Sequence, residues 1–263
     1  MQAQFYDRGW VRFPWHPATA AWAESARVVG KAAVHDPRHA EWLQCAGTWF
    51  IGVDALDNDA QGRLPDGPPL AGPALEFITD QWGDLPELHK AQLSVMFPGY
   101  PQPRDGESEA AFRYRRNRDA AHVDGVKMMP GQGRRRSVDE PHAWVLGVPL
   151  NVASADAAPL VIWEGSHHIM RRAFAEALRG HAPDSWGTLD ITDAYTQARA
   201  EAFETCQRVT VHAAPGESYL MHRLTLHGVS PWAEGATAPE GEGRMIAYFR
   251  PEVANLADWI AAE

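Results

Sequence analysis

The run Ala-Trp-Val-Leu-Gly-Val-Pro-Leu-Asn at residues 143–151 is the strongest single indication of the fold. It is short, apolar and flanked by turn-forming residues, which is typical of a β-strand in a protein core. Similar runs separated by Gly/Pro turns occur on both sides of it, at 91–97, 112–116, 119–123, 160–163, 207–213, 217–222, 225–230 and 243–250. Short strands at this spacing predict a mainly β protein with the architecture of a sandwich or barrel.

Helical patterns lie mostly outside these runs. The sequence predicts helices over 17–35, 38–45 and 74–82, a strand over 47–53 and a Pro/Gly-rich loop over 58–73. Two more helices are expected at 167–180 and 190–204, and a short closing helix over 251–263. No flexible linker divides the chain, so we predict one domain of residues 1–263. It would comprise a mostly helical elaboration (1–88), a β core with helical insertions (89–251) and a tail (252–263).

Composition excludes several classes of protein. The chain has 263 residues, is 45% hydrophobic and carries a net charge of −10, so binding to nucleic acid or to an anionic membrane is not expected. Its two cysteines, Cys45 and Cys206, provide no disulfide framework. No apolar run of 18 residues and no signal peptide are recognisable, so we expect a cytoplasmic location.

Common catalytic motifs are missing. There is no P-loop and no His-Glu-x-x-His, and residues 131–136 lack the third glycine of a dinucleotide fingerprint. Gly165-Ser166-His167 does not form the elbow of an esterase.

One constellation does carry chemistry. His122-Val-Asp124 ends a strand-like run, and His227-Gly228 follows another about a hundred residues later. On a strand, residues i and i+2 face the same side, about 6.6–7 Å apart, so His122 and Asp124 can converge on one metal. His222 is a rival to His227, but an odd spacing of five residues places the two on opposite faces of a continuous strand.

Two histidines and one carboxylate form the facial triad that binds non-haem iron. The triad leaves three adjacent positions on an octahedral Fe(II), enough for a bidentate 2-oxo acid and O₂. Arg244, which opens the last strand-like run, suits the far carboxylate of such a cosubstrate because its planar fork can pair both oxygens.

In these residues the chain resembles the Fe(II)/2-oxoglutarate-dependent oxygenases, and within them the phytanoyl-CoA dioxygenase-like family. The similarity covers roughly residues 90–251. Supporting segments are residues 144–150, Pro-Leu-Val-Ile-Trp-Glu-Gly-Ser-His at 159–167, Pro-Gly-Glu at 215–217, and Met-His-x-x-x-x-His-Gly at 221–228. Departures are Glu164 in place of the family's proline, Ser230 one position late, and an insertion at 233–243.

The resemblance implies a mainly β fold with helical additions. Specifically, it implies a double-stranded β-helix, also called a jelly roll or cupin-like fold, with the N-terminal helices packed on it. It further implies Fe(II) held by His122, Asp124 and His227, and 2-oxoglutarate held by Arg244. Trp144 and, more weakly, Gln92 are candidates for further contact with the cosubstrate.

The implied reaction is hydroxylation of a small molecule with O₂, releasing succinate and CO₂. Related halogenases lack the carboxylate ligand, so Asp124 argues for hydroxylation or another oxidation such as desaturation. Arg134 and Arg136 are candidates for binding an anionic substrate group. Two alternatives stay open: a Zn-dependent hydrolase that uses the His₂Asp set, and a catalytically silent ligand-binding protein on the same scaffold. The substrate and the oligomeric state are not determined.

Overall fold

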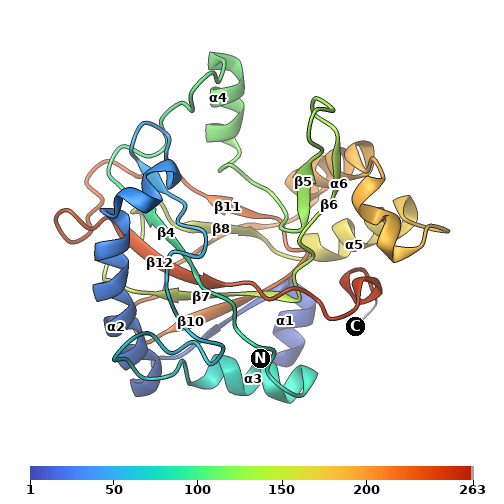
Figure 1. The fold of residues 1–263 in the computed structure, drawn as a ribbon. Coiled ribbons are helices and arrows are strands. Elements are labelled where there is room, and N and C mark those ends of the chain that lie inside the picture. The colour runs from blue at the N-terminus through green and yellow to red at the C-terminus, as the bar shows by residue number, and fades with distance from the viewer. Residues whose placement is uncertain (262–263) are drawn as a thin grey trace.

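The computed structural model describes residues 1–261 (Figure 1). Its α-helices are α1 (Gln2–Arg8), α2 (Pro17–Val34), α3 (Pro73–Trp82), α4 (Glu109–Asn117), α5 (Ser166–Ala177) and α6 (Thr192–Thr205). Short 3-10 helices cover Pro37–Trp42, Pro183–Thr188 and Leu256–Trp259. None of the helices within this range combines the length and apolar character needed to cross a bilayer.

Antiparallel sheets form the centre of the molecule. The large sheet has the order β1 (Trp10–Phe13), β10 (Ser218–His222), β7 (Trp144–Pro149), β12 (Arg244–Phe249), β4 (Gln92–Met96), β3 (Trp49–Phe50), β2 (Leu43–Gln44). The small sheet has the order β11 (His227–Val229), β8 (Leu160–Trp163), β9 (Arg208–Val211). A separate hairpin pairs β5 (Val126–Met128) with β6 (Arg136–Val138). From β7 to β12 the chain passes back and forth between the large and the small sheet.

The strand β7 shows how the two sides of the large sheet are filled. All its residues are buried, and successive side chains point to opposite faces. Trp144, Leu146 and Val148 belong to an apolar core that also contains residues of α2 and α3, and we call it the outer core. Val145 instead joins a smaller cluster formed with β8, β9, β10 and β12, which lies between the sheets. We call this smaller cluster the inner core; Ile162, Tyr219 and Ile246 are members.

The other faces of the two sheets are covered by helices. Trp22 of α2 lies with its ring 5.5 Å from that of Phe249 on β12. On the far side, Trp163 of β8 packs with its ring 5.1 Å from Phe203 of α6. In Figure 1, α2 and α3 lie beside the large sheet, α5 and α6 beside the small one.

Several predicted elements differ from the structure. Residues 112–116 are not a strand but belong to α4, where Ser108 caps the helix by accepting from the Ala111 N–H at 3.3 Å. The alternation of Phe112 and Tyr114 with arginines suggested a strand, but no residue of α4 is buried. Residues 119–123 form a single bridge at His122 rather than a strand. The elements α1, β1 and the β5–β6 hairpin were not predicted.

The predicted helices at 17–35, 74–82, 167–180 and 190–204 are confirmed within three residues at each end. The helix expected over 38–45 is a 3-10 helix of residues Pro37–Trp42, and the strand expected over 47–53 shrinks to Trp49–Phe50. The closing helix expected over 251–263 is reduced to Leu256–Trp259, and its last two residues lie outside the described range.

Candidate metal centre

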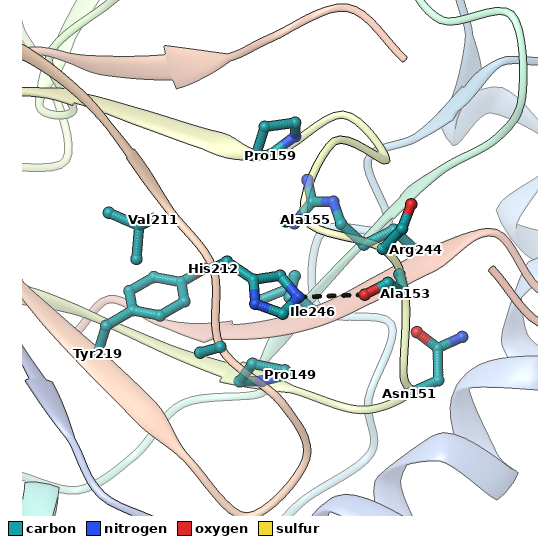
Figure 2. A pocket seen from close by; sticks show the side chains of 12 residues that line it. Pro149, Asn151, Ala153, Ala155, Pro159, Val211, His212, Tyr219, Arg244 and Ile246 are labelled. Atoms are coloured by element: carbon teal, nitrogen blue, oxygen red, sulfur yellow. Dashed lines mark hydrogen bonds between the residues drawn. The ribbon is translucent and has the colours of Figure 1, made fainter. Parts of the chain in front are cut away.

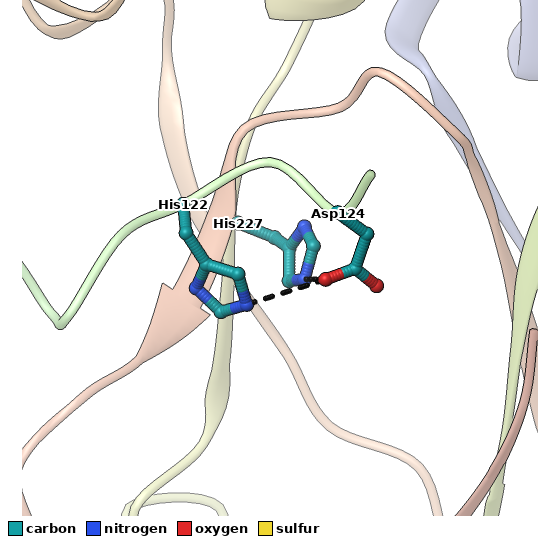
Figure 3. A group of neighbouring side chains, drawn as sticks. All are labelled: His122, Asp124 and His227. Carbon is teal, nitrogen blue, oxygen red and sulfur yellow. Dashed lines mark ion pairs between the residues drawn. The ribbon is translucent and has the colours of Figure 1, made fainter. Parts of the chain in front are cut away.

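The structure brings His122, Asp124 and His227 together. One ligand atom from each lies within 4.8 Å of the others. The His122 Nε2 is 3.5 Å from the Asp124 Oδ1, and the His227 Nε2 is 4.0 Å from the same oxygen. Figure 3 shows both imidazoles and the carboxylate directed at one point. The predicted triad is therefore a geometric cluster, although its three residues come from segments a hundred positions apart.

A backbone bridge creates this proximity. The N–H of His122 donates to the carbonyl of His227 at 2.8 Å, and the N–H of His227 donates back at 3.0 Å. Gly228 permits the close approach, because a Cβ at this position would lie 2.2 Å from the carbonyl oxygen of Asp119. In this pair, His227 provides a candidate metal ligand, and Gly228 leaves room for the backbone of the segment that contains Asp119 and His122.

A polar cluster around the buried carboxylate of Asp119 holds the same two segments in register. Arg208 donates to both carboxylate oxygens of Asp119, at 2.8 and 2.9 Å. Ser230 donates to the Asp119 Oδ1 at 3.0 Å, and the Val229 N–H donates to the Asp119 carbonyl at 2.7 Å. Hydrogen bonds between charged groups of this kind are stronger than bonds between neutral groups. Sequence reasoning missed Asp119 and Arg208, since their separation of 89 positions gives no local signal.

The hydrogen bonds of the two histidines leave the correct nitrogen free for a metal. The Nδ1 of His122 is 3.1 Å from the carbonyl oxygen of Ala120, and the Nδ1 of His227 is 2.9 Å from that of Thr225. A carbonyl oxygen only accepts, so each Nδ1 carries the proton. In the neutral ring the Nε2 then keeps its lone pair, and this is the arrangement that fixes metal-binding histidines.

Electrostatics favour the same protonation states. Burial by itself would raise the pKa of Asp124, but the adjacent side chain of His122 and the positive charge of Arg250 outweigh burial and hold that pKa well below its usual value. Burial, followed by the charge of His122, lowers the pKa of His227 to about 4. At neutral pH the cluster therefore offers one carboxylate and a neutral imidazole at His227.

Exposure differs within the triad. The side chain of His122 is 48% exposed, whereas those of Asp124 and His227 are 9% and 10% exposed. A ligand arriving from solvent therefore meets the His122 side of the cluster first.

Arg244 is the first residue of β12, and its side chain is directed into the space between the sheets. It shares the inner face of the strand with Ile246, because the residues alternate. Arg244 is 8% exposed, its Nε has no hydrogen-bond partner, and no carboxylate among residues 1–261 forms an ion pair with it. Figure 2 shows it bordering a small cavity with Asn151 and Tyr219, which no triad residue lines.

The two weaker cosubstrate candidates lie on different faces. Trp144 is 2% exposed and belongs to the outer core with Leu146 and Phe249, on the face of β7 that points away from the inner core, and its contact with the cosubstrate stays a prediction. Trp144 directly precedes Val145 of the inner core, and successive residues of a strand point to opposite faces, so Trp144 points away from the inner core. Gln92 alternates with Leu93 of the outer core and therefore faces the inner side; its role stays a prediction.

The arginines of residues 134–136 have separate surroundings. Arg134 is exposed, Arg135 pairs with Asp190 at 3.3 Å, and the Arg136 guanidinium lies 5.0 Å from the ring centre of Tyr195. Binding of an anionic substrate by Arg134 and Arg136 stays a prediction. His222, the rival of His227, packs away from the triad, with its ring 4.7 Å from that of His167.

Comparison with known proteins returns structures but no sequence relatives. The chain matches no model of a protein family and no curated protein. The non-heme alpha-ketoglutarate-dependent carbocyclase SnoK from nogalamycin biosynthesis is 12% identical with a TM-score of 0.45, covering 95% of this chain and 82% of that one. EctD from S. alaskensis with bound Fe is 14% identical with a TM-score of 0.45, covering 94% and 74%. A Pseudomonas putida prolyl-4-hydroxylase is 12% identical with a TM-score of 0.43, covering 95% and 96%.

Proposed function

We propose that this protein is an Fe(II)- and 2-oxoglutarate-dependent dioxygenase that hydroxylates a small molecule. The observation that carries the proposal is the convergence of two imidazole Nε2 atoms and one carboxylate oxygen within 4.8 Å. Two histidines and a carboxylate with open positions are the donor set that non-haem Fe(II) oxygenases use. The passage of the chain between two antiparallel sheets supports a double-stranded β-helix as the scaffold.

The donors present fit an iron ion. His122 and His227 have their Nδ1 atoms occupied by backbone carbonyls, and Asp124 is held ionised. Bound iron with 2-oxoglutarate and O₂ would supply the oxidising chemistry, converting a C–H bond to C–OH while the cosubstrate leaves as succinate and CO₂.

Arg244 is the residue we assign to the far carboxylate of 2-oxoglutarate. A buried guanidinium without an anionic partner is costly unless a ligand neutralises it. Arg244 is such a group, and its position between the sheets is on the inner face that also receives His227. A planar fork pairing two oxygens would orient the cosubstrate and fix which end reaches the triad.

The remaining residues have supporting roles. The inner core, which includes Tyr219 and Ile246, excludes water from the space between the sheets. The half-exposed side of His122 is the side from which the substrate would approach. Asp124 occupies the position that a halide would need, so the chain is suited to hydroxylation.

The test is an anaerobic titration of the metal-free protein with Fe(II) and then 2-oxoglutarate. We expect a weak metal-to-ligand charge-transfer band in the visible spectrum that requires both additions and is lost in His227→Ala. Succinate release would then serve to screen substrates. Absence of the band together with tight Zn²⁺ binding would instead favour a hydrolase. Absence of the band without metal binding would favour a silent binding protein.

A further inference from the structure

Arg250 contacts the metal-ligand candidate Asp124 on the oxygen that faces away from the histidines. Its Nη1 lies 3.5 Å from the Asp124 Oδ2, whereas the Oδ1 faces the Nε2 atoms of His122 and His227. The two oxygens of one carboxylate thus have different partners: one is directed at the metal position and the other at a guanidinium.

The surroundings of Arg250 give it few other anions to pair with. Its side chain is 19% exposed, and its Nε is buried without a hydrogen-bond partner. Within residues 1–261, Asp124 is the carboxylate that forms an ion pair with it, since Glu140 nearby is paired with Lys127. The backbone N–H of Arg250 donates to the His89 Nε2 at 3.2 Å, which ties down the base of the side chain.

We infer that Arg250 is a positioning residue that holds the Oδ2 of Asp124, so that the carboxylate binds a metal through Oδ1 alone. This inference rests on the proposed function. A carboxylate can bind a metal through one or both oxygens. Binding through both would occupy one of the three positions that the cosubstrates need. A guanidinium on the outer oxygen disfavours that mode, and outer partners of this kind contribute to metal affinity.

The chain contains a matched control at the start of β12, the strand whose last residue Arg250 directly follows. Arg244 lies six residues before Arg250, an even number, so the two side chains share a face if the chain between them is extended. Their Cα atoms would then be about 20 Å apart. Arg244 also has a buried, unpartnered Nε, but it forms no ion pair with Asp124. Comparing the two substitutions therefore distinguishes two causes of weaker metal binding. Loss of a buried positive charge would occur in both variants, whereas loss of the contact with Asp124 would occur only at Arg250.

The experiment measures metal affinity without 2-oxoglutarate, by anaerobic titration of Fe(II) and by titration of Mn(II). We expect Arg250→Gln to bind either metal about 10–100-fold more weakly than the wild type. Arg250→Lys keeps the charge but not the fork, so its loss should be smaller. Arg244→Gln should leave metal affinity unchanged. The absorption spectrum of the Co(II)-loaded protein gives a second readout, and it should change in Arg250→Gln but not in Arg244→Gln.

Metal affinities within twofold of the wild type in Arg250→Gln, with an unchanged Co(II) spectrum, would overturn the inference while leaving the proposed function intact. Equal weakening by Arg244→Gln would also overturn it, because the contact with Asp124 would then not be the cause. If Arg250→Gln does not fold, Arg250→Lys carries the test by the same two readouts. Failure of the proposed function is distinguishable: the wild type itself would then bind no metal, or would bind it as well after His227→Ala.

Discussion

Two arginines mark the two ends of β12 and have different surroundings: Arg244 is the first residue of the strand, and Arg250 directly follows its last residue. Arg250 lies at the triad and pairs with Asp124 at 3.5 Å. Arg244 lies at the other end, 8% exposed, and forms no ion pair within the described chain. An arginine at one end of β12 is thus paired with a carboxylate of the protein, whereas an arginine at the other end is available to a ligand. The anionic neighbour, supplied by a distant segment, makes the difference.

The largest effect is expected from removing the carboxylate that distinguishes the two ends. Asp124→Ala deletes a ligand and leaves Arg250 with no carboxylate to pair with, so repulsion is added to the lost donor. We expect Fe(II) affinity to fall at least about 100-fold, since loss of an outer partner alone costs 10–100-fold. Fe(II) titration and 2-oxoglutarate-dependent succinate release measure this. A variant with wild-type turnover would contradict the ligand assignment.

At the other end of β12, Arg244→Gln should weaken the binding of 2-oxoglutarate without weakening the binding of the metal. Two charge-assisted hydrogen bonds would be lost, and we expect an affinity loss of roughly 30–100-fold, or about 2–3 kcal/mol. Arg244→Lys should recover part of it. The measurement is a 2-oxoglutarate titration of the Fe(II) form by its visible band. If Arg250→Gln rather than Arg244→Gln abolished cosubstrate binding, the roles of the two ends would be reversed.

Acid should destabilise the metal-free protein, because the pKa values of His227 and His142 are lower in the folded chain than in the unfolded chain. Burial lowers the pKa of both His227 and His142 to about 4, whereas an unfolded histidine titrates near 6.5. Between these values the unfolded chain binds more protons, so stability falls as the pH drops from about 6.5 to 4. The loss is on the order of 3 kcal/mol per histidine at most.

Urea unfolding of the metal-free protein at a series of pH values measures this effect. His142→Gln removes one of the two histidines with a lowered pKa and keeps all three triad side chains, so the stability of this variant should depend less steeply on pH. An equally steep dependence in His142→Gln would show that this histidine does not contribute.

A smaller effect is expected from the packing near Arg244. A Cβ on Gly147 would lie 2.3 Å from the ring of Tyr219, whose hydroxyl is 2.9 Å from that of Tyr248. Gly147→Ala should therefore cost about 1–3 kcal/mol of stability and displace the Tyr219 ring. Gly187→Ala is the control, because the nearest atom to its Cβ would be 3.6 Å away. Equal urea midpoints for the two variants would contradict this packing.

The smallest effect on ligand binding is expected at Trp144. Its side chain packs in the outer core, on the face of β7 opposite the ligand space. Trp144→Phe should lower stability slightly and leave 2-oxoglutarate affinity within twofold of the wild type. A large loss of affinity at unchanged stability would show that the ligand space extends through the sheet.

The central strands of the large sheet were the part of the fold most open to prediction. Residues 143–151 and 243–250 are short apolar runs bounded by turns, and both are strands of the large sheet. Prediction failed at α4, where two aromatic residues alternate with arginines as on a strand, yet no residue is buried and Ser108 caps a helix. Hairpin β5–β6 was missed because each of its strands has three residues.

The sequence by itself determined the chemistry of the site. The identity of His122, Asp124 and His227 and the spacing of two between the first pair specify a donor set, and Gly228 specifies a close backbone approach. Only the tertiary structure decided which side chains share a space. It turned Trp144 outward, placed Arg250 against Asp124, and left Arg244 buried without an anion. The physical reason is that strand alternation fixes a side chain's face only relative to its neighbours, whereas its electrostatic partner comes from whichever distant segment packs against that face.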